Sequence, residues 1–251
     1  MSEPMLVLDS IGKSFGRRRV LSSATVHASP GRVTALLGRN GCGKSTLMKI
    51  AIGEHAADHG VIRFDGQWVR RPRLHRLAVL GLFYLPERGL IVGSSTIGAR
   101  IDAIARRFGG RTVEEVVSRL RLDPLLDRPP EQLSTGERRR AELALALIRA
   151  PRCMLADEPL MGLAPRDADD IAAALRELAA GGCGLIVTGH EVRVLLDTAD
   201  EVVWVVAGTT HALGPPEEAV RNRSFVRDYL SGPETTSTSK TAVRTTSSRR
   251  V

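Results

Sequence analysis

The amino-acid sequence predicts an α/β fold in which helices cover a parallel sheet. Short runs of apolar and β-branched residues alternate with helical patterns along most of the chain, as in strands joined by crossover helices. Between about residues 88 and 130 the strand patterns stop and only helical spacing is found. The chain has 251 residues, 43% hydrophobic and 25% charged. This ordinary globular composition excludes a wholly disordered or fibrous protein.

The first half of the predicted core consists of short strands and one helix. Turn residues such as Ser29-Pro30-Gly31 separate the strand-like runs, and Pro86 ends the last of them. The expected strands are Met5–Leu8, Ala24–Ala28, Val33–Leu37, Val61–Phe64 and Gly81–Leu85, and the expected helix is Gly43–Ile52.

A helical segment and the second half of the core follow. Pro124 and the pair Pro129-Pro130 close the segment, so we expect a small helical subdomain of about residues 88–132 inserted in a domain of residues 1–232. Residues 233–251 are rich in Ser, Thr and Arg and predict a disordered basic tail. The expected helices are Ile97–Arg107, Val113–Leu120, Glu137–Ile148 and Asp167–Leu178, and the expected strands are Cys153–Ala156, Gly184–Thr188 and Glu201–Val206.

Cysteine usage, apolar run lengths and charge restrict the class of protein. Cys42, Cys153 and Cys183 lack CxxC spacing, which argues against a zinc site or disulfide framework and fits a reducing compartment. No window has the roughly 18 consecutive apolar residues of a membrane span, and the N-terminus does not resemble a signal peptide. We therefore expect a soluble intracellular protein. The net charge of +8 comes without the aromatic residues that single-strand binders interleave, so we expect no nucleic-acid partner.

The strongest motif lies between a predicted strand and a predicted helix and fits G-x-x-x-x-G-K-[ST]. Its glycines let the backbone direct N–H groups at phosphate oxygens, and the next helix adds its positive N-terminal end. We expect Lys44 to reach the β- and γ-phosphates of a nucleotide and the Ser45 hydroxyl to bind Mg²⁺. A glycine-rich turn capped by Ser45 is the structural alternative. The expected nucleotide-binding residues here are Gly38, Arg39, Asn40, Gly41, Cys42, Gly43, Lys44, Ser45 and Thr46.

Two adjacent acids follow the predicted strand Cys153–Ala156. Side chains alternate along a strand, so consecutive acids at its end point in different directions. Asp157 is expected to hold Mg²⁺ through its water shell, and Glu158 to polarise an attacking water. Two solvated acids at a strand end are the alternative, which the phosphate loop upstream disfavours.

A third motif, LSTGE at residues 133–137, precedes an arginine-rich helical pattern. Ser134 is a typical N-cap, and Glu137 three residues later completes a capping box. Local structure alone would explain this pattern. A helix start that carries Ser134 and Gly136 is also suited to bind a γ-phosphate.

The order of these motifs resembles the ATP-binding subunit of ABC transporters. The phosphate loop is followed by LSTGE, by a strand ending in Asp-Glu-Pro and by His190, and LSTGE is similar to the LSGGQ signature of that superfamily. The resemblance covers about residues 4–231. It implies a P-loop NTPase (RecA-like) core with a mixed sheet, an N-terminal antiparallel β subdomain and a small helical subdomain.

The resemblance also implies roles for single residues. Phe15 matches the aromatic residue that stacks on adenine, and such stacking is worth about 1–3 kcal/mol. A core position in a hairpin is the alternative for Phe15. Glu158 matches the residue that positions the attacking water, and His190 the switch histidine that contacts the γ-phosphate, so both are expected to be catalytic. The expected metal ligands are Ser45, Glu87 and Asp157.

The family pattern implies ATP hydrolysis coupled to solute transport at the cytoplasmic face of the cell membrane. Two identical or related ATPase subunits pair head to tail, so that Ser134 and Gly136 of one subunit cover the ATP held by Lys44 of the other. Separate membrane-spanning permease subunits would contact the groove beside residues 88–105. An ABC-type ATPase that acts on ribosomes or DNA is one alternative, although 251 residues leave no room for a second cassette. A slow nucleotide-gated module is the other.

Three positions depart from the family pattern. Glu87 stands for the usual glutamine, Thr135 for glycine and Ala164 for aspartate. A carboxylate at position 87 cannot donate a hydrogen bond unless protonated, but it can still bind Mg²⁺. Three stretches resemble the branch of branched-chain amino acid importers and lipopolysaccharide exporters: PER at residues 86–88, LSTGERRR at 133–140 and GLAP at 162–165. We therefore expect import of an amino-acid-like solute. Residues 93–100 lack the acids of that branch.

Overall fold

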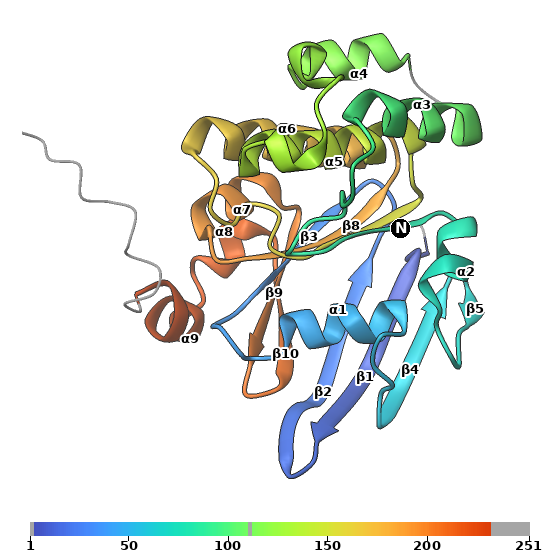
Figure 1. Ribbon diagram of the computed structural model, residues 1–251. Coiled ribbons are helices and arrows are strands. Elements are labelled where there is room, and N and C mark those ends of the chain that lie inside the picture. Colours follow the sequence, from blue (N-terminus) through green and yellow to red (C-terminus); the bar gives the residue numbers. More distant parts are fainter. Residues whose placement is uncertain (1–2, 110–111, 232–251) are drawn as a thin grey trace, which may run out of the picture.

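One ten-stranded mixed sheet organises the part of the protein that the computed structural model describes, residues 3–109 and 112–231 (Figure 1). Its strand order is β5-β4-β1-β2-β10-β9-β3-β8-β7-β6. The strands are β1 Leu6–Phe15, β2 Arg18–Ala28, β3 Val33–Leu37, β4 His59–Phe64, β5 Gln67–Trp68, β6 Leu82–Leu85, β7 Cys153–Ala156, β8 Gly184–Gly189, β9 Glu201–Val206 and β10 Thr209–Gly214. The predicted α/β fold class, with its mixed sheet, is confirmed. The predicted tail at 233–251 lies outside the described residues.

Helices cover both faces of the parallel strands. The helices are α1 Lys44–Ile52, α2 Leu74–Val79, α3 Ile97–Phe108, α4 Val113–Arg119, α5 Thr135–Arg149, α6 Pro165–Ala180, α7 Val192–Thr198, α8 Pro216–Ala219 and α9 Arg223–Phe225, with short turns at Asp123–Leu125, Pro130–Gln132 and Val226–Leu230. Leu36 of β3 faces the cluster that contains α1, whereas Ala35 and Leu37 face the cluster that contains α5 and α6. A strand buried on both faces is mostly apolar, and the one polar side chain of β3, Thr34, donates its hydroxyl to the His27 carbonyl oxygen at 3.1 Å.

The antiparallel part of the sheet extends further than the sequence predicted. The expected strands Met5–Leu8 and Ala24–Ala28 are the inner ends of a long hairpin, β1 and β2, whose tip turns at Gly16 with φ +59°. Toward its tip this hairpin is mostly polar and exposed, with Ile11 and Leu21 as the large buried side chains, so it lacks the apolar pattern that marks a strand. Strand β10 was not predicted for the same reason. The extension carries Phe15 toward the phosphate loop.

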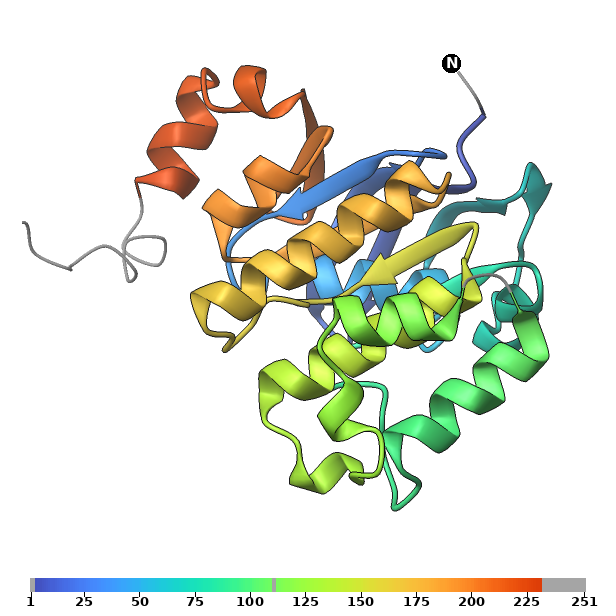
Figure 2. The same cartoon turned by 90° about the horizontal axis from the view of Figure 1, so that it is seen from above.

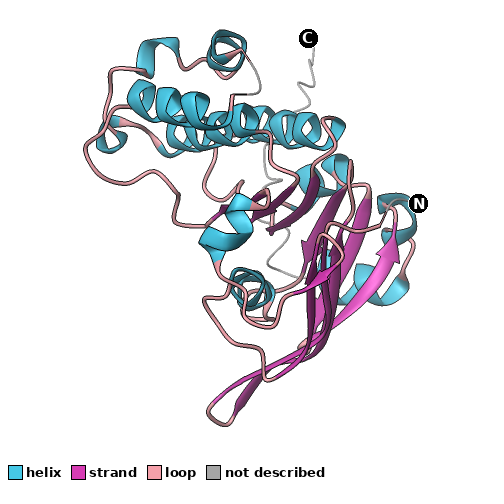
Figure 3. Ribbon diagram, turned by 90° about the vertical axis from the view of Figure 1, so that its right-hand side faces the viewer, coloured by secondary structure: helices cyan, strands magenta, loops and turns pink. Residues whose placement is uncertain are grey.

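The helices between β6 and β7 gather at one end of the molecule (Figures 2 and 3). Helix α3 is amphipathic, buries Ile97 and Ile101, and packs on α5. Both α3 and α4 lie within a residue of their predicted limits. The ion pair between Arg140 of α5 and Asp167 joins this group to α6. The division into a core and a helical subdomain of 88–132 stays a prediction.

A buried ion pair on α5 holds the loop that follows β6. Glu142 is 0% and Arg139 is 6% exposed, and their side chains lie 3.0 Å apart. Glu142 accepts hydrogen bonds from the N–H groups of Leu90 and Ile91, the second at 3.1 Å. Arg139 donates to the carbonyl oxygens of Pro86 at 3.1 Å and of the next residue at 2.9 Å. The pair therefore fixes the loop of residues 86–91 on the helix.

Glu142→Ala is expected to lower the free energy of unfolding by about 3–5 kcal/mol, because it leaves the Arg139 charge buried without its partner. Urea unfolding followed by circular dichroism measures the change. Glu131→Ala, which removes an exposed acid, is the control and should change stability by no more than about 0.5 kcal/mol. Equal losses in the two variants would contradict the assigned role of the pair.

Candidate nucleotide-binding site

Four neighbouring parallel strands carry the parts of the predicted site. Strands β3, β8, β7 and β6 lie side by side in that order and run parallel, so their carboxyl ends share one edge of the sheet. The phosphate loop follows β3, His190 follows β8, Asp157 and Glu158 follow β7, and Glu87 follows β6. A hollow of about 520 Å³ lies at this edge. It is lined by Phe15, Arg18, Val20, Asn40, Gly41, Gly43, Lys44, Ser45, Thr46, Glu87, Glu158, Met161 and His190.

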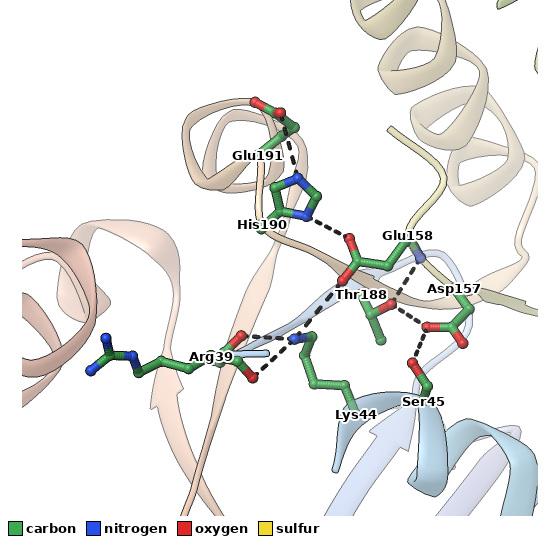
Figure 4. A network of polar contacts seen from close by, with 9 residues as sticks. Arg39, Lys44, Ser45, Asp157, Glu158, Thr188, His190 and Glu191 are labelled. Carbon is green, nitrogen blue, oxygen red and sulfur yellow. Dashed lines mark hydrogen bonds and ion pairs between the residues drawn. The ribbon is translucent and has the colours of Figure 1, made fainter. Parts of the chain in front are cut away.

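The phosphate loop places a lysine at the base of the hollow. Gly43 has φ +113°, and a Cβ there would lie 2.5 Å from the Leu21 side chain, so only glycine fits. Lys44, 5% exposed, begins α1. Its Nζ donates to the carbonyl oxygens of Gly38 at 2.7 Å and Arg39 at 3.4 Å (Figure 4). The ammonium group is thus held by the loop itself, within reach of an anion lying over it.

Asp157 and Ser45 meet beside the loop. The Ser45 hydroxyl donates to Asp157 Oδ1 at 3.1 Å, and the Thr188 hydroxyl donates to the same oxygen at 2.7 Å (Figure 4). Thr188 Oγ1 also accepts the N–H of Glu158 at 2.9 Å. One threonine of β8 therefore orients both acids that follow β7. The site brings together two hard oxygen donors, a hydroxyl and a carboxylate.

Glu158 points away from its neighbour Asp157, as predicted from strand alternation. Its Oε1 lies 3.9 Å from Lys44 Nζ, and its Oε2 lies 3.0 Å from His190 Nδ1 (Figure 4). Glu158 has φ +50°, a left-handed conformation that is uncommon for a residue with a side chain. Such backbone strain concentrates at functional sites, where the surrounding structure holds it in place. The carboxylate thus lies between a lysine and a histidine at the mouth of the hollow.

Phe15 lies at the rim of the hollow. Its ring is 44% exposed, which excludes a core position in the hairpin. The His55 ring packs against it edge to face, with the two centroids 5.2 Å apart, and Lys13 Nζ lies 5.3 Å from the Phe15 centroid. Both side chains therefore contact the Phe15 ring, which also lines the hollow.

The LSTGE motif lies apart from these residues, at the first turn of α5. Ser134 and Glu137 form the predicted capping box, with Ser134 Oγ accepting the Glu137 N–H at 3.3 Å and Glu137 Oε2 accepting the Ser134 N–H at 2.8 Å. Ser134 is exposed, whereas Gly136 is buried. A Cβ on Gly136 would lie 2.3 Å from Asp167 Oδ2, so a larger residue there would displace the Asp167 carboxylate. The predicted nucleotide contact of Gly136 stays a prediction.

Burial and charge set the protonation of two groups beside the site. Burial raises the pKa of the Cys42 thiol, with Lys44 opposing the shift, so the thiol is neutral near pH 7 and does not compete with an anion for the loop. Burial, and next the charge of Asp157, raises the pKa of Tyr84 on β6. Tyr84 therefore stays a neutral phenol throughout the physiological range.

Besides the lining residues Val20 and Met161, sequence reasoning missed two polar residues of the site, Thr188 and Arg18. Thr188 carries a hydroxyl in an otherwise apolar strand that ends at Gly189, and that was its one signal. Arg18 is one of three consecutive arginines, Arg17–Arg19, that belong to no motif in the sequence. In the fold it lines the hollow, with Nη2 at 3.8 Å from where a Gly41 Cβ would lie. Neither position was predictable because both depend on strands brought together by the sheet.

Comparison with known proteins shows which family this chain resembles. The model of the ABC transporter family matches residues 21–161. The chain is 33% identical over 235 residues to a probable ABC transporter ATP-binding protein of Azorhizobium caulinodans, covering 91% of this chain and 84% of the relative. It is 30% identical over 233 residues to the lipopolysaccharide export system ATP-binding protein LptB of Haemophilus influenzae, covering 90% and 97%. The ADP conformation of MJ1267, an ATP-binding cassette of an ABC transporter, superimposes with TM-score 0.78 at 24% identity, covering 92% and 100%.

The fold and the matched family define the class: the chain belongs to the ABC transporter family. Within that family it is an ATP-binding subunit, an ATPase whose hydrolysis of ATP is coupled to transport. The family resemblance stated from the motifs is therefore confirmed. In the two described stretches of the chain, 3–109 and 112–231, no helix is both long and apolar enough to cross a bilayer.

Proposed function

We propose that ATP binds in the hollow at the carboxyl ends of β3, β8, β7 and β6, with its adenine on Phe15 and its phosphates over the loop at Lys44. The single observation that carries the proposal is the network of Figure 4, in which Lys44 and His190 both contact Glu158. Lys44 would move from the carbonyl oxygens of its own loop to the phosphates. Arg18 supplies the second cation of the lining, next to Gly41.

Hydrolysis follows from the position of Glu158 in the same proposal. Its carboxylate, held by His190 Nδ1, orients and polarises a water for attack on the γ-phosphorus, while the Glu158 N–H, which donates to Thr188 Oγ1, fixes the backbone of the residue. The water oxygen bonds to phosphorus as the bond to the β,γ-bridging oxygen breaks, the water gives a proton to the Glu158 carboxylate, and ADP is the leaving group. Lys44 stabilises the negative charge on the β- and γ-phosphates during this step. His190, at the rim of the hollow, contacts the γ-phosphate with its other ring nitrogen.

The residues present fit Mg²⁺. Ser45 Oγ and Asp157 Oδ1 lie 3.1 Å apart, and hydroxyl and carboxylate oxygens are ligands that Mg²⁺ accepts. In the described part of the chain no group of three or more His, Cys, Asp or Glu could hold a metal alone. That suits a cation that takes further ligands from phosphate and water. When bound, Mg²⁺ would neutralise part of the phosphate charge. Glu87, which lines the hollow, is the third candidate ligand.

A second ATPase subunit would complete the site. The exposed, capped N-terminus of α5 at Ser134 presents backbone N–H groups that suit a phosphate. Because Ser134 does not line the hollow at Lys44 of its own chain, we propose that it covers the nucleotide of a partner subunit. Thr135 and Glu87 both line a neighbouring hollow of about 230 Å³, so two of the three departures from the family pattern lie together at this edge.

Exposed apolar side chains mark the surface for membrane-spanning subunits. Val79 and Leu80 at the end of α2, Leu90 and Val92 after β6, and Phe108 of α3 are large and exposed. The Arg149 guanidinium connects the end of α2 with α3. It donates to the Ala78 carbonyl and lies 4.9 Å from the Phe108 ring centroid. Apolar patches of this kind are typical of protein interfaces. We propose that a permease contacts this surface on the cytoplasmic side of the membrane.

Val92→Asp is expected to reduce the amount of membrane subunit that co-purifies with the tagged chain from detergent-solubilised membranes by at least about tenfold, because a charge would be buried in the interface. ATPase activity of the isolated chain should stay unchanged. Val220→Asp, an exposed valine after α8, is the matched control and should leave co-purification intact. Equal co-purification by Val92→Asp and the unaltered chain would reject this docking surface.

The cargo belongs to the same proposal. Relatives named for lipopolysaccharide export, at 30% to 33% identity, favour an exported lipid-containing molecule over the branched-chain amino acid import expected from the motifs. The names of the relatives described above place them in transport, which disfavours a role on ribosomes or DNA. Identification of the membrane subunits in the co-purification separates exporter from importer.

A further inference from the structure

A second hollow lies at the β5 edge of the sheet, away from the predicted ATP site. Its volume is about 650 Å³, larger than the roughly 520 Å³ at the phosphate loop. It is lined by the loop from Gly53 to Asp58 after α1, by β4, and by residues 68–73, which connect β5 to α2. Figure 1 shows β4, β5 and α2 together at this edge. The volume is within the usual range of about 300–1,000 Å³ for small-molecule sites.

Three arginines give this hollow a strong positive charge. Arg70, Arg71 and Arg73 line it and are exposed, and none of them has a side-chain hydrogen bond or ion pair within the described residues. Among the described residues that line this hollow, Asp58 is the one acid. Its carboxylate is already engaged, by Lys13 Nζ at 3.0 Å and by the Ser14 N–H at 2.6 Å. Three like charges without partners repel one another, and a bound polyanion would remove that repulsion.

An aromatic ring stands beside these charges. Trp68 of β5 lines the hollow and is 70% exposed, which is unusual for so large an apolar side chain. Guanidinium groups bind phosphate through paired N–H donors, and an exposed indole stacks on a nucleobase. The two features together fit a phosphorylated molecule that carries an aromatic ring, and they fit neither a plain anion nor an apolar ligand as well.

Two residues that line the hollow, His55 and Asp58, also contact Phe15 or the residue before it. His55 lines it and packs edge to face on the Phe15 ring, with centroids 5.2 Å apart. Asp58 lines it and binds the backbone N–H of Ser14, the residue before Phe15. A ligand that shifts His55 or Asp58 would therefore shift the ring on which adenine is expected to stack.

We propose that this hollow is a second, regulatory nucleotide site, which holds phosphates on Arg70, Arg71 and Arg73 and a base on Trp68, and which alters ATP affinity through His55 and Phe15. Binding at the hollow stands on its own residues. Its regulatory effect rests on the proposed role of Phe15 in ATP binding. Because coupling between two binding sites is reciprocal, ATP at the first site changes affinity at the second by the same factor.

Tryptophan fluorescence tests binding without the first site. The chain has two tryptophans, and Trp204 is only 7% exposed, so quenching by a stacked base reports on Trp68. The full chain with Lys44→Ala is titrated with ADP, with pyrophosphate and with adenosine. ADP is expected to quench the fluorescence and to bind at least about tenfold more tightly than either fragment, because it engages both the arginines and the indole. Trp68→Phe should abolish the signal.

The charge requirement has a matched control. The triple variant Arg70→Gln, Arg71→Gln, Arg73→Gln is expected to weaken ADP binding at least about tenfold. The triple variant Arg76→Gln, Arg193→Gln, Arg223→Gln removes the same charge from exposed positions outside the hollow and should bind as before. Absence of ADP quenching, or equal binding by the two triple variants, would overturn the site. Binding of an oligonucleotide or of anionic vesicles without binding of ADP would overturn it as well.

The regulatory effect is measured separately, in the chain with an intact phosphate loop. The Arg70/Arg71/Arg73 triple variant is expected to change the KM for ATP at least about threefold, and the control triple variant to leave it unchanged. If the Arg70/Arg71/Arg73 triple variant has an unchanged KM for ATP while ADP still quenches the fluorescence of Lys44→Ala, the regulatory effect is rejected and the assignment of a binding site stands. If Phe15→Ala leaves the KM for ATP unchanged, the adenine assignment in the proposed function is wrong, while the fluorescence result stands.

Discussion

Glu158→Gln is expected to lower kcat for ATP hydrolysis by about 100-fold or more, because the amide cannot polarise the attacking water as a carboxylate does. Glutamine has nearly the same size and keeps a hydrogen-bonding oxygen for His190. ATP affinity should therefore stay within about threefold of the original, as for a group that acts mainly in the transition state. Phosphate release measures kcat, and titration with a fluorescent ATP analogue measures affinity.

The same variant tests pairing of subunits. If hydrolysis releases two subunits held together by ATP, Glu158→Gln should accumulate an ATP-bound dimer on size-exclusion chromatography. Glu131→Gln, an exposed acid outside the hollow, is the control and should hydrolyse ATP at the original rate. Turnover by Glu158→Gln at that same rate would show that Glu158 is not the residue that positions water.

Lys44→Ala is expected to weaken ATP binding about 100-fold, since hydrogen bonds to charged groups are worth roughly 1.5–3 kcal/mol and the ammonium would contact more than one phosphate oxygen in the proposed complex. The loop should keep its shape, because Gly43 and its neighbours set the backbone through their own dihedral angles. Equilibrium titration with a fluorescent ATP analogue measures the loss, and circular dichroism verifies folding.

Lys49→Ala is the matched control for Lys44→Ala. Lys49 lies on the same helix, α1, and does not line the hollow, so its removal should leave ATP affinity within about twofold. Unchanged affinity in Lys44→Ala would reject the phosphate-loop assignment. Equal losses in both variants would show that the effect comes from net charge or from helix stability.

Local patterns predicted the parallel core well, because each of its strands is buried on both faces. Strands β3, β7, β8 and β9 are predominantly apolar runs that a sequence displays directly, with Thr34, Thr188 and Glu201 as the polar exceptions. The same patterns failed for the outer half of the β1–β2 hairpin, where Ile11 and Leu21 stand among polar residues, and for β10, which has no buried residue. Burial requires apolar residues, and their spacing is the signal that a sequence displays. The strands with little burial were therefore the ones missed.

The motifs predicted which residue types belong to the site but not how they are held. The glycine-rich loop with Lys44 and the acids after β7 could be recognised because each lies in a contiguous segment. Thr188, the buried Arg139–Glu142 pair and the support of Phe15 by His55 join segments far apart in the chain. No sequence spacing encodes such contacts, since they arise only after the sheet and α5 have packed.

The sequence by itself therefore determined the class of fold, the phosphate loop and the two acids, because each depends on backbone preference or on a contiguous run of residues. Only the tertiary structure decided that Glu158 takes a left-handed backbone between Lys44 and His190, since strand order β3-β8-β7 sets those distances. It alone also formed the arginine-lined hollow beside Trp68, where the electrostatic field depends on which side chains the folded chain leaves without partners.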